Sequence, residues 1–293
     1  MNDDGLDGLR KSLAWAQNKL EVIKMENAIS IAQQQESGVG AIAGSAILSV
    51  MLNRASERPR DEQESLRASM AELEAVPGLA EDAYYSIPYE SDGKKVPVEG
   101  LTIGAAMSLV RRWGNLLTGA KTVGEDDKGW DLEGTAYDLE SNILIMRPYR
   151  VSKFYKPRGG QNVVPLDHNR RLAAFQSGVS KAVRNCALAV IPEWFKAAYF
   201  EMAKQLVLNP PQKIGKVAKS IQERILMARG AFAKNWKVTD AEMTDYLSGL
   251  ALEDDNAVLL HLQGLFNGLK EGRESADNVF GRIKPQPTMP QEK

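Results

Sequence analysis

The fold is decided by the stretch WDLEGTAYDLESNILIMRPYRVSKFY, which runs from Trp130 to Tyr155. Two segments of it, Trp130–Leu139 and Ile143–Tyr155, are rich in aromatic and β-branched residues. The polar triplet Glu140-Ser141-Asn142 between them is a turn sequence. Short runs of this composition, separated by a few turn residues, predict strands that pair as an antiparallel hairpin.

Further strands are predicted before this hairpin. Leu116–Val123 has strand composition, and the polar segment Glu125–Gly129 that follows is a turn sequence. Earlier in the chain, Tyr84–Tyr89 and Lys95–Val98 also have strand composition, with the turn sequence Ser91-Asp92-Gly93 between them. The sequence therefore predicts a β-meander of about three to five strands.

A long helix is predicted directly after the meander. Asp167 is a suitable N-cap residue, and Pro192 ends or kinks the helix after Val190. Apolar residues recur at steps of three and four and form one stripe, which consists of Leu172, Phe175, Val179, Val183, Cys186 and Val190. A second stripe is mostly polar and consists of Arg170, Ser177, Lys181, Arg184 and Leu188. The predicted fold class is α+β, with the meander packed on a long basic helix.

Helical regions are predicted on both sides of this core. Residues from about Asp3 to Ala75 have helical periodicity, and Pro77-Gly78 ends that region. Other predicted helices are Leu101–Trp113, Glu193–Leu208, Lys213–Asn235, Asp240–Leu250 and Asp255–Glu271. The predicted organisation is a helical N-terminal region (1–75), a β-meander and helix core (76–209), a helical C-terminal region (210–283) and a disordered tail (284–293).

Composition restricts the class of protein. Of 293 residues 26% are charged and 43% are hydrophobic, which is typical of a globular chain. The single cysteine, Cys186, allows no disulfide framework and is expected in the core. The acidic start of the chain has no apolar run behind it, and no stretch approaches 18 apolar residues. We therefore expect a soluble, cytoplasmic protein without a signal peptide or membrane span.

Positive charge is concentrated in one segment. The chain has a net charge of −1, yet Arg147–Arg184 contains nine basic residues and one acid, Asp167. Tyr149, Phe154 and Tyr155 lie among these cations. Cations that neutralise phosphates, together with rings that stack on bases, are typical of surfaces that bind single-stranded nucleic acid. The alternative is an ordinary solvated strand face.

Alternation along the last strand divides these side chains between two faces. It places Arg147, Tyr149, Lys153 and Tyr155 on one face, whereas Arg150 and Lys156 fall on the other. The second stripe of the long helix could join this strand in one basic groove.

Two other patterns suggest enzymes. Gly114–Thr122 resembles a phosphate-binding loop, but it has one residue too many before Lys121 and follows a predicted helix. Six carboxylates could suggest a two-metal nuclease; they are Asp126, Asp127, Asp131, Glu133, Asp138 and Glu140. No acid-x-lysine pair completes that pattern. The two histidines, His168 and His261, lack partners at metal-ligand spacing. No catalytic, metal or cofactor site is therefore expected.

Several motifs resemble those of a known family. They are Tyr85-Ser86-Ile87-Pro88, Gly100-Leu101-Thr102-Ile103, Arg112-Trp113-Gly114-Asn115, Ala136-Tyr137-Asp138-Leu139-Glu140 and the helical segment Ser180–Pro192. Their array is similar to that of the RecT, Red-beta and Erf groups of phage and prophage single-strand annealing proteins. The resemblance covers roughly Tyr84–Gly272, and residues 1 to about 75 lie outside it.

The resemblance implies a non-enzymatic function in phage recombination inside the bacterial host, namely ATP-independent binding of single-stranded DNA and annealing of complementary strands. It also implies a homo-oligomeric ring or filament that holds the annealed duplex intermediate. A phage exonuclease and a host single-strand-binding protein are possible partners. The expected DNA-binding residues are Arg111, Arg112, Arg147, Tyr149, Arg150, Lys153, Tyr155, Lys156, Arg158, Arg170, Arg171, Lys181 and Arg184. The alternatives are a metal-dependent nuclease and a non-enzymatic phage adaptor or assembly protein.

Overall fold

A computed structural model describes residues 41–76, 78–91, 94–155, 163–211 and 219–282. The chain divides into two compact units, Met1–Arg58 and Pro59–Lys293. In the first unit the structure describes the helix α2 (Ala41–Glu57). The earlier part of the predicted helical N-terminal region and the predicted tail (284–293) lie outside the described residues.

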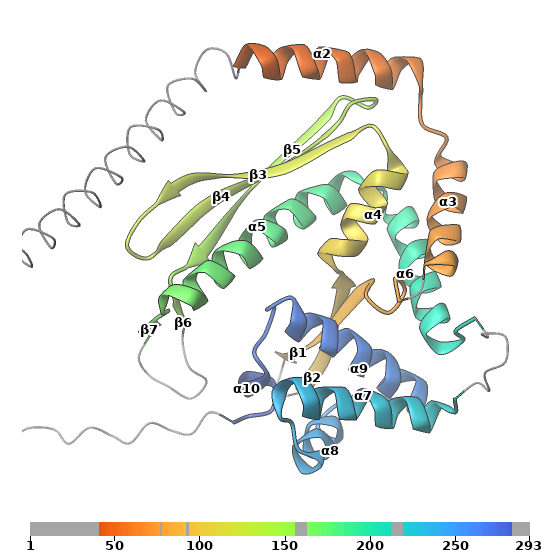
Figure 1. Ribbon diagram of the computed structural model, residues 1–293, viewed down its shortest axis with the longest axis vertical. Helices are drawn as coiled ribbons and strands as arrows, with labels where there is room; N and C mark the ends of the chain where they lie inside the picture. Colours follow the sequence, from red (N-terminus) through yellow and green to blue (C-terminus); the bar gives the residue numbers. More distant parts are fainter. Residues whose placement is uncertain (1–40, 77, 92–93, 156–162, 212–218, 283–293) are drawn as a thin grey trace, which may run out of the picture. The chain divides into compact units, whose positions relative to one another are not determined.

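The second unit contains both strands and helices (Figure 1). Its strands are β1 (Tyr84–Ser91), β2 (Lys94–Leu101), β3 (Leu116–Glu125), β4 (Gly129–Asp138), β5 (Ile143–Ser152), β6 (Phe154–Tyr155) and β7 (Val164–Pro165). Its helices are α3 (Glu62–Ala75), α4 (Ile103–Trp113), α5 (His168–Val190), α6 (Glu193–Leu208), α7 (Ile221–Trp236), α8 (Asp240–Ser248), α9 (Asp255–Lys270) and α10 (Ala276–Val279). The predicted α+β class, with small antiparallel sheets and helical terminal regions, is confirmed.

The meander is the three-stranded antiparallel sheet β3-β4-β5, and α5 lies along one of its faces (Figure 1). Glycines allow the helix to approach closely. A Cβ atom on Gly134 of β4 would lie 2.6 Å from the carbonyl oxygen of Ala182 in α5, and one on Gly178 would lie 2.1 Å from Val151. The sheet and the helix therefore meet backbone to backbone, with Leu132 and Cys186 buried beside the contact.

This contact predicts a stability loss for Gly134→Ala. The new methyl group would press against helix backbone, which cannot move aside as a side chain could, so we expect a loss of about 1–3 kcal/mol in the free energy of unfolding. A methyl group on Gly119 of β3 would have no other atom within 4 Å, so Gly119→Ala is the matched control. Urea denaturation of both variants measures this loss. Equal unfolding midpoints for the two variants would show that the close approach of sheet and helix does not restrict the residue at position 134.

Local signals set the ends of α5. The side chain of Asp167 accepts a hydrogen bond from the Arg170 amide at 2.9 Å, which confirms the predicted N-cap. At the other end Pro192 occupies the N-cap position of α6, so the chain turns there and continues as a second helix. The predicted boundary between the two helices is confirmed.

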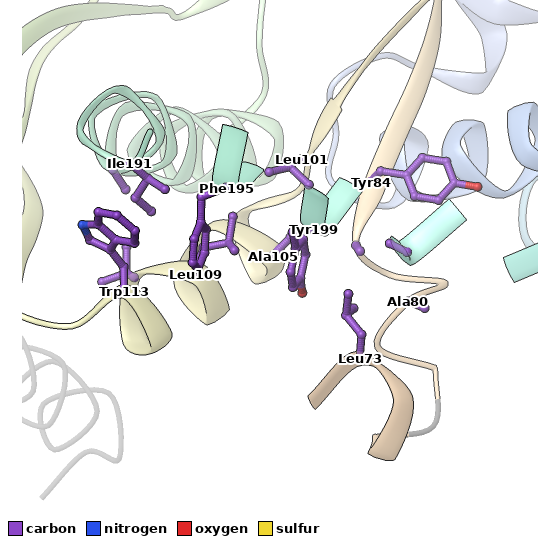
Figure 2. Close-up of a cluster of buried hydrophobic side chains, with 14 of the residues drawn as sticks. Leu73, Ala80, Tyr84, Leu101, Ala105, Leu109, Trp113, Ile191, Phe195 and Tyr199 are labelled. Carbon is purple, nitrogen blue, oxygen red and sulfur yellow. The ribbon is translucent and has the colours of Figure 1, made fainter. Parts of the chain in front are cut away.

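A first apolar core joins the helices next to the sheet (Figure 2). Leu109 and Trp113 of α4 pack with Ile191 and with Phe195 of α6, and the rings of Trp113 and Phe195 meet edge to face at 4.9 Å. Leu73 brings α3 into the same cluster. The helix α3 belongs to the second unit, so the unit boundary at residue 58 precedes the sequence-based boundary at residue 75.

A second core lies in the C-terminal region. Phe232 of α7, Met243 of α8, and Leu262 and Leu265 of α9 form its centre. The helix α9 also packs on β1, where a Cβ atom on Gly264 would lie 2.6 Å from the Ser86 amide. The hairpin β1-β2 is therefore covered by a helix that follows it by more than 150 residues.

Buried polar groups link this hairpin to the helices. His261 of α9 lies between two hydroxyls, with Nδ1 at 2.7 Å from Ser86 Oγ and Nε2 at 2.8 Å from Tyr246 Oη. All three residues are buried, and burial lowers the pKa of His261 to about 4. Asn267 of α9 donates to the carbonyl of Tyr84. These contacts satisfy polar groups at the interface between β1 and the C-terminal helices.

A second polar cluster surrounds Arg60. Its guanidinium donates to the carbonyl oxygens of Trp113 and Gly114 at 2.8 and 3.1 Å, and to both carboxylate oxygens of Asp138 at 3.0 and 3.2 Å. Its backbone amide donates to Glu140, and its side chain is only 7% exposed. Arg60 therefore ties the segment before α3 to the ends of α4 and β4.

Two sequence-based boundaries need adjustment, and one predicted strand is confirmed. The predicted last strand, Ile143–Tyr155, is divided at Ser152, and β6 pairs with β7 instead of extending the meander. The segment that resembles a phosphate-binding loop forms the predicted strand, β3, after Gly114 and Asn115, both of which have positive φ. The helix predicted from Lys213 begins at Ile221, with Ser220 as its N-cap, and residues 212–218 lie outside the described residues.

Candidate nucleic-acid interface

The strand β5 presents its predicted basic residues on two different faces. Arg147 pairs with Gly134, and Tyr149 pairs with Leu132, so both are on the face that α5 covers. Arg150 pairs with Asp131 and is on the opposite face. The prediction that Arg147 and Tyr149 share a face is confirmed, whereas Lys153 and Tyr155 lie beyond the end of β5.

Some of the predicted DNA-binding cations have acidic partners. Arg150 donates to Asp126 and to Asp131, each at 2.7 Å, and its hydrogen bond to Asp126 is the largest cause that lowers the pKa of Asp126 to about 2. The ammonium group of Lys153 lies 2.5 Å from Glu125 and over the ring of Trp130. These pairs hold the β3-β4 turn against β5, so their positive charge is largely neutralised.

The helix α4 ends with two predicted cations. Arg112 pairs with Glu72 at 2.7 Å, and this hydrogen bond is the largest cause of the lowered pKa of Glu72. Arg111 is exposed in the same last turn. Arg112 therefore joins α4 to α3.

The first turn of α5 presents two exposed arginines. Arg170 lies 3.3 Å from Asp167, and its guanidinium carbon is 5.7 Å from the centre of the Tyr155 ring. Arg171 donates to the carbonyl oxygen of Leu166. An exposed pair such as Arg170 with Asp167 contributes little energy, so both guanidinium groups can contact a phosphate without a large loss.

The second stripe of α5 lies against the end of α9. Ser177 donates to the carbonyl oxygen of Glu271 at 3.2 Å. Burial and the neighbouring Arg184 lower the pKa of Lys181, while Glu271 and Glu274 act in the opposite direction. Burial raises the pKa of Glu271. The predicted basic groove is therefore partly closed by the C-terminal region at this stripe.

Arg184 has an unusual set of neighbours. Its Nε and Nη2 donate to Oδ1 of Asn185 at 3.2 and 2.8 Å, and Nη1 is buried with no hydrogen-bond partner among the described residues. Its guanidinium carbon is 5.5 Å from the centre of the Tyr85 ring, and that of Arg273 is 3.6 Å from the same ring. Two arginines therefore flank one tyrosine.

Sequence reasoning did not select four residues near these cations. Tyr85 was assigned to a strand and to one of the family-like motifs but not to the DNA-binding residues, and Arg273 follows the last predicted helix. Asn185 and Lys196 line an open depression together with Arg147, Leu188 and Ala189. Asn185 adjoins Arg184 in the sequence, which was the one available signal. Lys196 comes from α6, and no local pattern connects that helix with β5.

Two of the predicted residues cannot be placed. Lys156 and Arg158 lie outside the described residues. The described part of the basic segment is thus β5, β6, β7 and α5.

The carboxylates that suggested a nuclease are mostly paired with cations. Asp126 and Asp131 contact Arg150, Glu133 contacts Lys121, and Asp138 contacts Arg60. Within the described ranges, no group of three or more histidine, cysteine, aspartate or glutamate side chains could hold a metal ion. Nor does any helix in those ranges have the length and apolar character needed to cross a membrane.

The comparisons with known proteins add no family assignment: no family model, no curated protein and no solved structure matches the chain.

Proposed function

We propose that this chain binds single-stranded DNA without sequence preference and anneals complementary strands without ATP, in the cytoplasm of a bacterium that carries the phage or prophage. One observation carries the proposal. Among the described residues, Arg147 on β5 and Arg171 and Arg184 on α5 have no acidic hydrogen-bond or ion-pair partner. Unneutralised cations on adjacent elements attract a polyanion.

The chemistry of this surface fits a non-covalent mechanism. Guanidinium groups hold phosphates, and the exposed ring of Tyr155, next to Arg170, adds a base-stacking surface. Contacts of this kind leave the base edges free. Base pairing with a second strand then supplies the free energy of annealing. No bond is made or broken, so no catalytic residue takes part.

The resemblance to annealing proteins supports the remaining parts of the proposal. A ring or filament of identical subunits would hold one continuous strand and, later, the duplex intermediate. A phage exonuclease would supply the strand, and a host single-strand-binding protein would cover it beforehand.

The direct test is annealing of two complementary labelled oligonucleotides with purified protein, without ATP and with EDTA present. We expect faster pairing than in the protein-free control. Binding of labelled oligothymidylate should weaken as salt rises, with a slope in log affinity of about 0.7 per phosphate neutralised. Arg147→Ala should lower that slope by about 0.7, whereas Arg67→Ala, at an exposed site on α3, should leave it unchanged.

Other results would select other functions. Binding without accelerated pairing would indicate a DNA-loading role. Absence of binding would indicate that the basic segment contacts an acidic protein, as in a phage adaptor. Cleavage of the oligonucleotide on addition of Mg²⁺ would indicate a nuclease.

A further inference from the structure

The depression between β5, α5 and α6 combines three hydrogen-bond donors with no carboxylate in its lining. Arg147, Asn185 and Lys196 provide these donors, and Leu188 and Ala189 provide the remaining, apolar lining. Positions that bring a guanidinium, an amide and an ammonium group together without an acid attract anions.

The fold fixes Arg147 and Asn185 next to each other. Arg147 pairs with Gly134 of β4, and a Cβ atom on Gly134 would lie 2.9 Å from the Cys186 sulfur, so the sheet approaches α5 at the residue that follows Asn185. Cys186 is fully buried beside Gly134. Because this contact belongs to the close packing of sheet and helix, it fixes the backbones of Arg147 and Asn185 relative to each other.

The orientation of the Asn185 amide is also fixed. Its Oδ1 accepts two hydrogen bonds from Arg184, so the Nδ2 group is left as a donor and has no partner among the described residues. Arg147 is exposed and likewise has no hydrogen-bond or ion-pair partner for its guanidinium group within the described part of the chain. The guanidinium group of Arg147 and the Nδ2 group of Asn185 can therefore both donate hydrogen bonds to a bound anion.

Lys196 is held in place but remains able to bind an anion. Its Nζ donates to the Leu188 carbonyl at 2.8 Å and lies 2.7 Å from the Glu193 carboxylate. The Glu193 side chain is 86% exposed, so solvent screens its carboxylate, whereas the Lys196 side chain is only 18% exposed. The bond to the Leu188 carbonyl positions the ammonium group, while its third proton stays free.

From this geometry we infer that Arg147, Asn185 and Lys196 form a binding site for a phosphate group of a nucleic-acid strand. The inference rests on the proposed function and extends it to Asn185 and Lys196. Guanidinium, amide and ammonium groups all donate hydrogen bonds of the kind that the two non-bridging oxygens of a phosphodiester accept. Such contacts do not depend on the base. The strand would thus pass over the junction of β5 with α5 and α6.

The decisive variant is Asn185→Asp. The new side chain keeps its shape and still offers an oxygen to Arg184, so the fold is retained. It replaces the donor Nδ2 with a negatively charged oxygen that repels phosphate. We expect oligothymidylate affinity to fall about tenfold at constant salt. Asn256→Asp adds the same charge at an exposed position in the first turn of α9 and should change affinity less than twofold.

A second variant and a second ligand keep the site testable if Asn185→Asp affects folding. Arg147→Gln alters an exposed residue and should also lower affinity about tenfold. Calorimetric titration with pyrophosphate tests the anion site without DNA. Weaker pyrophosphate binding by both site variants, but not by Asn256→Asp, would support the site.

The outcomes separate this inference from the proposed function. If the wild-type protein binds DNA and the site variants behave like Asn256→Asp, the phosphate site is overturned and the proposed function stands. If the wild-type protein binds pyrophosphate at this site but binds no oligonucleotide, the phosphate does not belong to a nucleic-acid strand. The proposed function then fails as well. Binding of neither ligand would overturn both.

Discussion

Arg60→Ala is expected to lower the free energy of unfolding by about 3–5 kcal/mol, the range typical of breaking one side of a buried ion pair. The alanine would leave the Asp138 carboxylate without its guanidinium partner while that carboxylate stays buried. Burial opposes ionisation of Asp138, yet the bonds from Arg60 and from backbone amides still hold its pKa below the usual value. The carbonyl oxygens of Trp113 and Gly114 would also lose their donor.

Chemical denaturation monitored by tryptophan fluorescence measures this loss. The ring of Trp113 lies 4.3 Å from the Arg60 guanidinium, so it reports on the altered site. Arg67→Ala is the control, because the side chains of Arg67 and Glu64 are both more than half exposed and such pairs contribute about 0.5 kcal/mol or less. A loss below about 1 kcal/mol for Arg60→Ala would be at odds with a buried, fully bonded arginine.

Acidification is expected to destabilise the protein through His261. An ordinary histidine has a pKa of 6.5, whereas burial lowers the pKa of His261 to about 4. As the pH falls below 6.5, His261 becomes protonated in the unfolded chain but stays neutral in the folded chain. The free energy of unfolding therefore decreases progressively down to about pH 4. This linkage contributes a loss of about 3 kcal/mol between pH 7 and pH 4. Above pH 6.5 the contribution is constant.

The two histidines of the chain allow a clean comparison. His261→Gln removes the titrating group, so the fall in stability between pH 7 and pH 4 should be about 3 kcal/mol smaller than in wild type. His168 is exposed, and His168→Gln should keep the wild-type profile. Because the carboxylates titrate in all three proteins, the difference between profiles isolates His261. Parallel profiles for wild type and His261→Gln would contradict the assignment.

Most elements of the fold follow from local signals. Asp167 and Pro192 delimit α5, and Thr239 with Glu242 forms a capping box at the start of α8. The alternation in β5 correctly separates Arg147 from Arg150. Such signals depend on neighbours within a few residues, which the sequence displays directly. The packing of α9 on β1 depends on residues far apart along the chain, and no periodicity indicates it.

The candidate site was harder to predict, for an electrostatic reason. The sequence lists the cations of Arg147–Arg184 but does not show which of them meet an acid. Arg150 and Lys153 are paired with carboxylates of the β3-β4 turn, and Lys181 faces the end of α9. Lys196 enters the site from a different helix. The density of charge along the sequence therefore identifies the basic region, but it does not show which of its residues remain accessible to a ligand.

The packing of α9 on β1 also has a consequence while the chain is synthesised on the ribosome. Ser86 and its partner His261 are 175 residues apart. At a translation rate of about 5–20 residues per second, roughly 10–35 s pass between the appearance of the hairpin and that of its covering helix. During this time the inner face of β1 has no native partner from α9. The nascent chain thus exposes this face of its first hairpin to chaperones until α9 has been synthesised.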